Sequence, residues 1–173
     1  MMTSRTYDST MYTGLKTGFK KHLRITGTDL DDQLDICLKA SINSAEQFVG
    51  VCLVKSTIVE DVPFAERTKL PRPLIGVSQV TLIVERGGVY NGIVLLPTEY
   101  KVEGSYLVIT DSSLTGDSLT ITMTVGRSIM EDDIKAAIYL RAAKLFNNPA
   151  DSVETMINAS DNLLAPHRQI DGE

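Results

Sequence analysis

Two histidines and two cysteines are the side chains best suited to metal binding or nucleophilic chemistry, and their spacing favours neither. His22 and His167 stand near opposite ends of the 173-residue chain, with no third ligand at the spacing of a metal site. Cys37 and Cys52 match no zinc pattern. If one helix carries both cysteines, as we predict, their 15-position separation (52 − 37) spans about 22 Å, too far for a disulfide. We therefore expect reduced core cysteines, no metal and no cofactor.

The glycines and acidic clusters also lack the setting of a catalytic site. Gly87 and Gly88 fall in a predicted hairpin turn, not between a strand and a helix, so they match no phosphate-binding loop. The chain has no Gly-x-Ser-x-Gly nucleophile motif. Two acidic clusters open predicted helices, where they complement the helix dipole; cation binding is the alternative. These clusters are Asp29/Asp31/Asp32 and Glu131/Asp132/Asp133. The sequence therefore predicts a protein that is not an enzyme.

Basic side chains gather near the N-terminus. Lys16, Lys20, Lys21 and Arg24 form either a solvated helix face or a contact with an acidic neighbouring subunit or a nucleic-acid backbone. Arg141 lies among apolar residues of a later predicted helix, so it must reach solvent or find an acid across an interface. We take these five residues as candidates for inter-subunit or DNA-proximal contacts.

Composition places the chain among ordinary globular proteins, with 43% hydrophobic and 23% charged residues. The 17 basic and 22 acidic residues give a formal net charge of -5, which argues against sequence-specific nucleic-acid binding. The same charge is compatible with a surface that DNA slides past, because repulsion prevents sticking. No apolar run approaches the roughly 18–20 residues of a membrane span.

Four segments have the apolar periodicity of helices. We predict them from about residue 12 to 23, from 28 to about 48 or slightly beyond, from 131 to 147, and from 151 or 152 to 165. Gly27 is expected to end the first helix, and Thr28 or Asp29 to cap the second. Pro149 and Pro166 end the last two. The apolar stripes of these helices suit a small bundle.

The middle of the chain instead alternates as strands do. Strands are predicted at 55–62, 77–85, 93–96, 100–102, 107–109 and 118–126, with turns at Gly87-Gly88 and Asn91-Gly92. In the last strand Leu119, Ile121, Met123 and Val125 alternate with threonines, which predicts a sheet with one buried face and one wet face. The fold class is thus α+β: a small helical bundle of two N-terminal and two C-terminal helices with an inserted antiparallel β block. We expect the domain boundaries at 1–53, 54–127 and 128–173.

The segment from Leu163 to Arg168 combines apolar and basic residues. Leu163, Leu164, Pro166, His167 and Arg168 form either an ordinary helix end or a tail that docks on a partner.

Several motifs, in order, resemble the head–tail connector proteins of tailed phages, the small adaptors that sit below the portal. They are Leu15-Lys16 with Phe19-Lys20-Lys21-His22-Leu23-Arg24-Ile25, then Asp31-Asp32-Gln33-Leu34, Leu38-Lys39-Ala40-Ser41 and Ala45-Glu46-Gln47-Phe48-Val49-Gly50. Further along come Leu70-Pro71-Arg72-Pro73-Leu74, Val77-Ser78-Gln79-Val80, Glu131-Asp132-Asp133-Ile134-Lys135-Ala136-Ala137-Ile138 and Leu163-Leu164-Ala165-Pro166-His167-Arg168. The chain departs from the pattern at His167, where an aromatic residue is usual, and at Met130, where a proline is common.

The resemblance implies a structural adaptor of the longer form, with a β insertion. It implies a homo-oligomeric ring, typically a dodecamer, between the portal protein and the tail-side stopper or tail-completion protein. Double-stranded DNA would pass through its channel without sequence-specific binding, and no membrane would be involved. The protein would belong to the virion at the head–tail interface and be assembled in the cytoplasm of a bacterial host. The alternative is a soluble α+β ligand- or protein-binding module without catalytic activity, with the β block as the binding surface.

Overall fold

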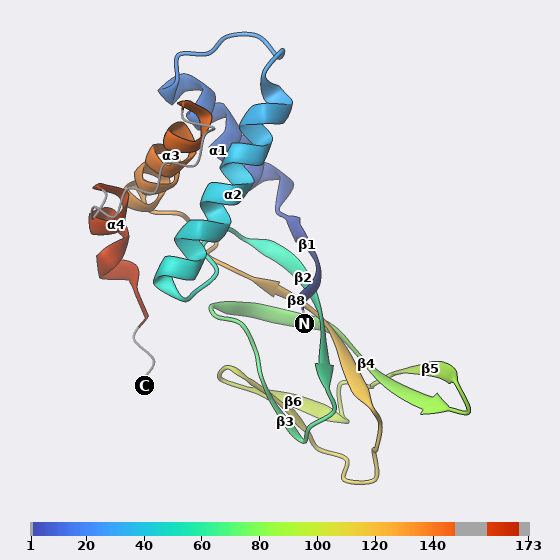
Figure 1. The fold of residues 1–173 in the computed structure, drawn as a ribbon. Helices are drawn as coiled ribbons and strands as arrows, with labels where there is room; N and C mark the ends of the chain where they lie inside the picture. Colours follow the sequence, from blue (N-terminus) through green and yellow to red (C-terminus); the bar gives the residue numbers. More distant parts are fainter. Residues whose placement is uncertain (1, 148–158, 170–173) are drawn as a thin grey trace. The chain divides into compact units, whose positions relative to one another are not determined.

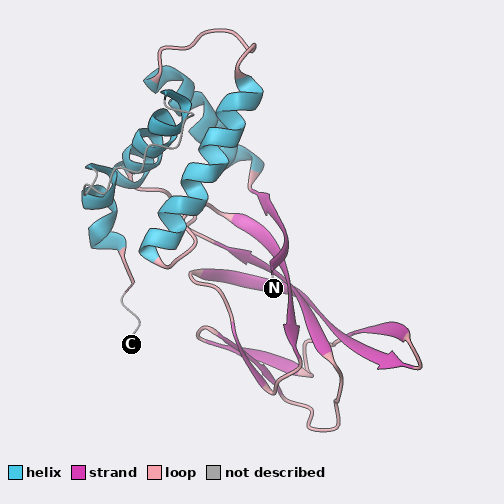
Figure 2. Ribbon diagram, viewed as in Figure 1, coloured by secondary structure: helices cyan, strands magenta, loops and turns pink. Residues whose placement is uncertain are grey.

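The structure is a computed structural model that describes residues 2–147 and 159–169. The chain forms two compact units, a β unit of residues 1–8 and 55–126 and a helical unit of residues 9–54 and 127–173 (Figures 1 and 2). The fold class is α+β, with antiparallel strands between two pairs of helices, as predicted. The first eight residues lie in the β unit, whereas we expected all of 1–53 in the bundle.

The helical unit contains α1 (Ser9–His22), α2 (Asp31–Val49), α3 (Asp132–Asn147), α4 (Ala159–Leu164) and the short 3-10 helix η1 (Ala165–His167). The predicted start of the last helix, at 151 or 152, lies outside the described residues. Apolar side chains three and four positions apart put one face of each long helix into a common core. The largest fully buried ones are Phe19, Leu34, Leu38, Ile42, Ile134 and Ile138.

The ends of the first two helices differ from the prediction. Helix α1 ends at His22, and Arg24 is the first residue after it in the left-handed conformation, at φ 57°; Gly27, with φ 89°, comes three positions later. The amides of Arg24 and Ile25 then donate to the carbonyls of Lys21 and Lys20, which closes the helix. Helix α2 begins at Asp31, and Leu30 at its N-cap makes no side-chain capping bond. Neither Thr28 nor Asp29 is therefore the cap that we predicted.

Helix α2 ends at Val49, so it carries Cys37 but not Cys52, and the prediction of one helix for both is wrong. Gly50 follows in the left-handed conformation, at φ 76°. Buried Glu46 accepts hydrogen bonds from the amides of Leu53 (2.7 Å) and Val54 (3.1 Å), which holds the chain as it leaves the helix. Both cysteines are free thiols, and burial raises the pKa of Cys37.

The β unit has a five-stranded antiparallel sheet in the order β1-β2-β8-β4-β5. Its strands are β1 (Met2–Tyr7), β2 (Ser56–Pro63), β4 (Leu74–Arg86), β5 (Val89–Val94) and β8 (Ser118–Val125). A smaller sheet has the order β3-β7-β6, from β3 (Arg67–Lys69), β6 (Tyr100–Glu103) and β7 (Tyr106–Ile109). The predicted hairpin over 100–109 is therefore present.

Strand β8 is the centre of the larger sheet, and its alternation is as predicted. Leu119, Ile121, Met123 and Val125 are buried, and the residues between them are partly exposed. On the wet face Thr120 donates a hydrogen bond to Asp61 Oδ1 of β2 at 2.6 Å. The large sheet therefore has a buried apolar face and a threonine-rich face.

Strands β1 and β3 were not predicted, and β5 was predicted only in part, as a strand at 93–96 after a turn. Strand β5 runs straight through Asn91-Gly92, where we expected a turn, because Gly87 and Gly88 already form the hairpin turn with φ values of 62° and 81°. Strand β1 is a polar segment without apolar alternation. It forms because it pairs with β2 along the sheet edge, from Ser4 opposite Val59 to Tyr7 opposite Ser56.

Candidate interaction site

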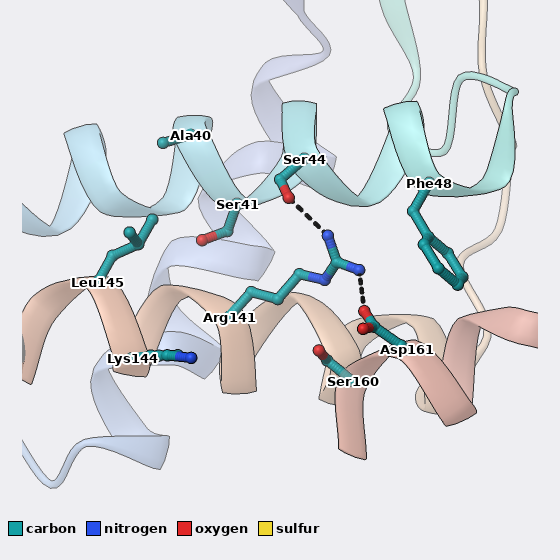
Figure 3. A pocket seen from close by; sticks show the side chains of 9 residues that line it. All are labelled: Ala40, Ser41, Ser44, Phe48, Arg141, Lys144, Leu145, Ser160 and Asp161. Atoms are coloured by element: carbon teal, nitrogen blue, oxygen red, sulfur yellow. Dashed lines mark hydrogen bonds and ion pairs between the residues drawn. The ribbon is translucent and has the colours of Figure 1, made fainter. Parts of the chain in front are cut away.

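A groove lies between α2, α3 and α4 in the helical unit (Figure 3). Its volume is about 620 Å³. Ala40, Ser41, Ser44 and Phe48 line it from α2, Arg141, Lys144 and Leu145 from α3, and Ser160 and Asp161 from α4. The polar side chains of this lining are three serines, Arg141, Lys144 and Asp161, which can form hydrogen bonds and ion pairs.

Arg141 connects the three helices that form this groove. Its guanidinium donates to Ser44 Oγ on α2 at 2.6 Å and forms an ion pair with Asp161 on α4. It also lies 5.4 Å from the centre of the Phe48 ring. We predicted that Arg141 would reach solvent or an acid across an interface. That prediction is corrected, because its acid is on the same chain, 20 positions away.

Two buried polar atoms of the groove residues lack a hydrogen-bond partner in the described part of the chain: Ser41 Oγ and Arg141 Nε. Such atoms are costly to bury unpaired, so this surface favours contact with a polar group.

The segment from Leu163 to Arg168 folds back on the helical unit. Leu164 is fully buried, His167 Nε2 lies 2.7 Å from Asp133 Oδ2 at the start of α3, and the Gln169 amide donates to the Val49 carbonyl at 2.9 Å. The hydrogen bond from His167 lowers the pKa of Asp133. We considered this segment as a docking tail. In the structure Leu164 and His167 anchor it to its own chain, Leu163 is half-buried, and Pro166 and Arg168 stay exposed.

The basic cluster on α1 divides into paired and exposed members. Lys20 lies 2.6 Å from Asp31 Oδ1, and Lys16 lies 3.8 Å from carboxylate oxygens of both Asp31 and Asp35 on α2. The hydrogen bond from Lys20 holds the pKa of Asp31 below its usual value. Two of the five cationic candidates are thus engaged in joining α1 to α2.

The side chains of Lys21 and Arg24 are exposed. The second acidic cluster is paired as well: Glu131 with Arg127, Asp132 with Lys135, and Asp133 with His167. Among the described residues we find no group of three or more histidine, cysteine or acidic side chains that could hold a metal ion. None of the described helices is long and apolar enough to cross a membrane.

The exposed edge strand β5 was not predicted as one continuous strand. Every residue from Val89 to Val94 is exposed, including four large apolar side chains. A signal was present, because the run Val-Tyr-Asn-Gly-Ile-Val carries no charged residue in a chain that is 23% charged. Because we expected a turn at Asn91-Gly92, we did not predict one continuous strand across these residues.

Comparison with solved structures reveals the same fold in phage-like particles. The chain matches a protein in the neck of the native gene transfer agent (GTA) particle computed with C12 symmetry, with a TM-score of 0.71 over 100% of this chain and 97% of that one. It also matches the neck of the empty particle computed with C6 symmetry (TM-score 0.70, 98% and 97%). This chain has the fold of a protein of the GTA neck.

A third match is to the virion of the native GTA particle, with a TM-score of 0.67 over 98% of this chain and 97% of that one. The sequence identity is 18% in all three comparisons. No family model and no curated protein matches the sequence. The likeness to the neck fold agrees with the resemblance to head–tail connectors seen in the sequence motifs.

Proposed function

We propose that the chain is a structural protein of the neck of a phage-like particle, where it forms a ring between the portal and the tail-side stopper or completion protein. The observation that carries this proposal is the extent of the fold likeness. It covers 98–100% of this chain and 97% of the neck chains, so it includes both units and not one shared module.

Symmetry supports a ring. The neck structures with this fold were computed with C12 and C6 symmetry. A closed cyclic ring of identical subunits needs two different, complementary faces on each subunit. We propose twelve copies, assembled in the cytoplasm of the bacterial host and retained in the virion.

The charges of the chain suit a DNA channel. A net charge of -5 repels a DNA backbone, so that DNA can pass without sticking. Lys21 and Arg24 are the exposed members of the basic cluster and are the better inter-subunit or DNA-proximal candidates. Lys16, Lys20 and Arg141 contribute to such contacts indirectly, because they hold the helices in place. Pro166 and Arg168 are the exposed candidates for docking on the portal.

The role proposed is mechanical and not catalytic. In the groove Arg141 pairs with Ser44 and Asp161, and in the second acidic cluster Glu131, Asp132 and Asp133 each contact a basic partner. Its chemistry is that of an interface.

The proposal is tested by measuring the mass of the purified chain by light scattering, alone and with the cognate portal, followed by electron microscopy of the complex. We expect rings on the portal with the symmetry of the portal. A chain that stays strictly monomeric and ignores the portal would exclude the adaptor function. Binding of a small ligand or a host protein by the isolated monomer would then support the alternative, a binding module.

A further inference from the structure

The smaller sheet, β3-β7-β6, has two different faces (Figure 1). Directly opposite residues of an antiparallel pair share a face, and so does every second residue along a strand. Leu107 of β7, which lies opposite Thr68 and Val102, is fully buried and marks the face directed at the core. The other face consists of two rows of side chains, each crossing all three strands: Arg67, Val108 and Lys101, then Lys69, Tyr106 and Glu103.

We call these six residues the basic face. Its four charged side chains are exposed, and Tyr106 and Val108 on the middle strand are half-buried. Three cations and one carboxylate give it a net charge of +2 (3 − 1), whereas the whole chain carries -5 and the rest of the chain therefore -7 (-5 − 2). A local charge opposite to that of the molecule creates a potential that attracts an anionic partner.

Contacts within the basic face orient its charges. The Arg67 guanidinium lies 4.1 Å from the centre of the Tyr106 ring. Stacking of this kind covers the plane of a guanidinium and leaves its N–H edge for an anion. Lys101 Nζ lies 2.7 Å from Glu103 Oε1. The hydrogen bond from Lys101 lowers the pKa of Glu103, and the charge of Arg67 adds to this effect, so the carboxylate of the face lies in a positive field.

The composition of the basic face favours a phosphate backbone over an acidic protein. The centre of a protein–protein interface is apolar and depleted in lysine and glutamate. Here Tyr106 and Val108 are the apolar part, and charged side chains flank them on both neighbouring strands. A phosphate backbone needs closely spaced cations and no apolar centre.

The dimensions of the face also suit a DNA strand. Its two rows lie about 7 Å apart along the strands, and its outer strands lie about 10 Å apart. Phosphates of one DNA strand follow one another about every 3.4 Å along the helix axis, so a face of this size meets about three of them.

We propose that the basic face contacts the phosphate backbone of double-stranded DNA, with one phosphate for each of Arg67, Lys69 and Lys101. The contact does not depend on base sequence, because bonds to phosphate carry no sequence information and the face contains neither asparagine nor glutamine. This inference deepens the proposed neck function, on which it rests for the presence of DNA.

A contact of three cations is weak and sensitive to salt. The logarithm of the affinity falls with the logarithm of the salt concentration, with a slope of about -0.9 for each neutralised phosphate. Three phosphates give a slope of about -2.7, so the affinity falls roughly 40-fold between about 50 and 200 mM salt. Such a contact guides DNA without retaining it, which agrees with DNA that passes through a ring.

The salt dependence of DNA binding tests the contact. The full chain is titrated into a fluorescent double-stranded oligonucleotide between about 50 and 200 mM salt, and binding is followed by anisotropy. We expect a slope of about -2.7 for each bound copy, the same for two unrelated sequences. Arg67→Ala and Lys101→Ala should each reduce the steepness by about 0.9 and the affinity at low salt roughly tenfold. Combining them with Lys69→Ala should abolish binding.

Two matched variants serve as controls. Arg86→Ala removes an exposed cation from the end of β4 in the larger sheet, and it should leave the slope unchanged. Glu103→Gln removes the carboxylate of the basic face and releases Lys101, so it should bind DNA more tightly. Thermal unfolding midpoints and light scattering show whether the variants keep the fold and the mass of the wild type.

The outcomes separate this inference from the proposed function. A wild-type chain that does not bind at about 50 mM salt, or a triple variant with an unchanged slope, would overturn the DNA contact while rings on the portal leave the neck function intact. Polyglutamate that competes as well as DNA, charge for charge, would also overturn it and indicate an acidic protein partner, because extended polyglutamate has about half the linear charge density of duplex DNA. A chain that binds DNA through this face but ignores the portal keeps the contact and overturns the neck function.

Discussion

Arg24 is a residue with a Cβ atom in a backbone conformation that favours glycine. It has φ 57° after α1, where a residue with a Cβ atom is strained by about 1–2 kcal/mol. Glycine at this position should therefore stabilise the helical unit, although the greater freedom of glycine in the unfolded chain offsets part of the gain. We expect Arg24→Gly to raise the free energy of unfolding by about 1 kcal/mol, measured by urea denaturation.

The matched control for that change is Arg24→Ala. It removes the same charge but keeps the Cβ atom, so it should give no such gain. Equal effects of the two variants would assign the stabilisation to charge rather than to backbone strain.

Two aspartates make the stability of the helical unit depend on acid pH. The hydrogen bonds from His167 and Lys20 lower the folded pKa values of Asp133 and Asp31 below 3.8. A depressed carboxyl pKa contributes stability that is present above the unfolded pKa and is lost as pH falls through the folded value. We expect the midpoint temperature of thermal unfolding to decrease as the pH is lowered below about 4. This decrease should be less steep in the Asp133→Asn variant.

Asp132→Asn is the control for this pH experiment, because the Asp132 side chain is 97% exposed. It should leave the steepness of the acid transition near that of the wild type. If both variants behave alike, the contact between His167 and Asp133 does not contribute to the pH dependence.

The pairs of side chains that are far apart in the sequence are the part of the site that could not be predicted from the sequence. Arg141 and Asp161 are 20 positions apart, and His167 and Asp133 are 34 apart. Periodicity identifies which face of a helix is buried, but it does not say which charge on one element meets which charge on another. The sequence therefore marked Arg141 as a residue that must reach solvent or find an acid across an interface, and it could not show that the acid is Asp161 of the same chain.

The joint between α2, α3 and α4 depends on Arg141 and Asp161, whose side chains are only 14% and 25% exposed. Removing the acid leaves a half-buried guanidinium without its counter-charge. We expect Asp161→Ala to lower the free energy of unfolding by roughly 1–3 kcal/mol. Adding Arg141→Met should recover part of that loss, because it removes the unpaired charge and keeps an apolar stem.

Lys144→Met is the control for the joint, since it removes a cation that lines the same groove. It should change stability less than Asp161→Ala. Simple additivity of Asp161→Ala and Arg141→Met in chemical denaturation would show that the two residues do not act as a pair.

Strands were predicted best where apolar and polar residues alternate. They were predicted worst where a strand forms only because a neighbouring strand is available for pairing. The alternation of β8 was enough to give its span and its buried face. Strand β1 has no such pattern, and it exists because the edge of β2 is available to it. At β5 two turn signals competed four positions apart, and Gly87-Gly88 formed the turn in place of Asn91-Gly92. Local propensity could not decide between the two turn positions, because the pairing of β5 with β4 determines which of them forms the turn.

At the scale of the whole chain, the structure determines which variants can test docking of the C-terminal segment on the portal. Deleting the chain from Leu163 onward would remove Leu164, which is fully buried, so loss of docking would not be distinguishable from loss of folding. The exposed side chains of the same segment, Pro166 and Arg168, separate the two effects. Docking on the portal should depend on them and folding should not.

The double variant Pro166→Ala/Arg168→Glu should therefore lose most of its binding to the cognate portal in co-sedimentation, while its thermal unfolding midpoint stays close to that of the wild type. Arg168 lies 5.6 Å from the centre of the Phe48 ring, a contact that is worth only about 0.5–1 kcal/mol at an exposed site. Leu164→Ala is the opposite control: it should cost about 2–5 kcal/mol of stability and reduce docking only as far as it reduces the folded fraction. Wild-type docking by the stable double variant would show that the closing segment anchors the chain to itself and not to the portal.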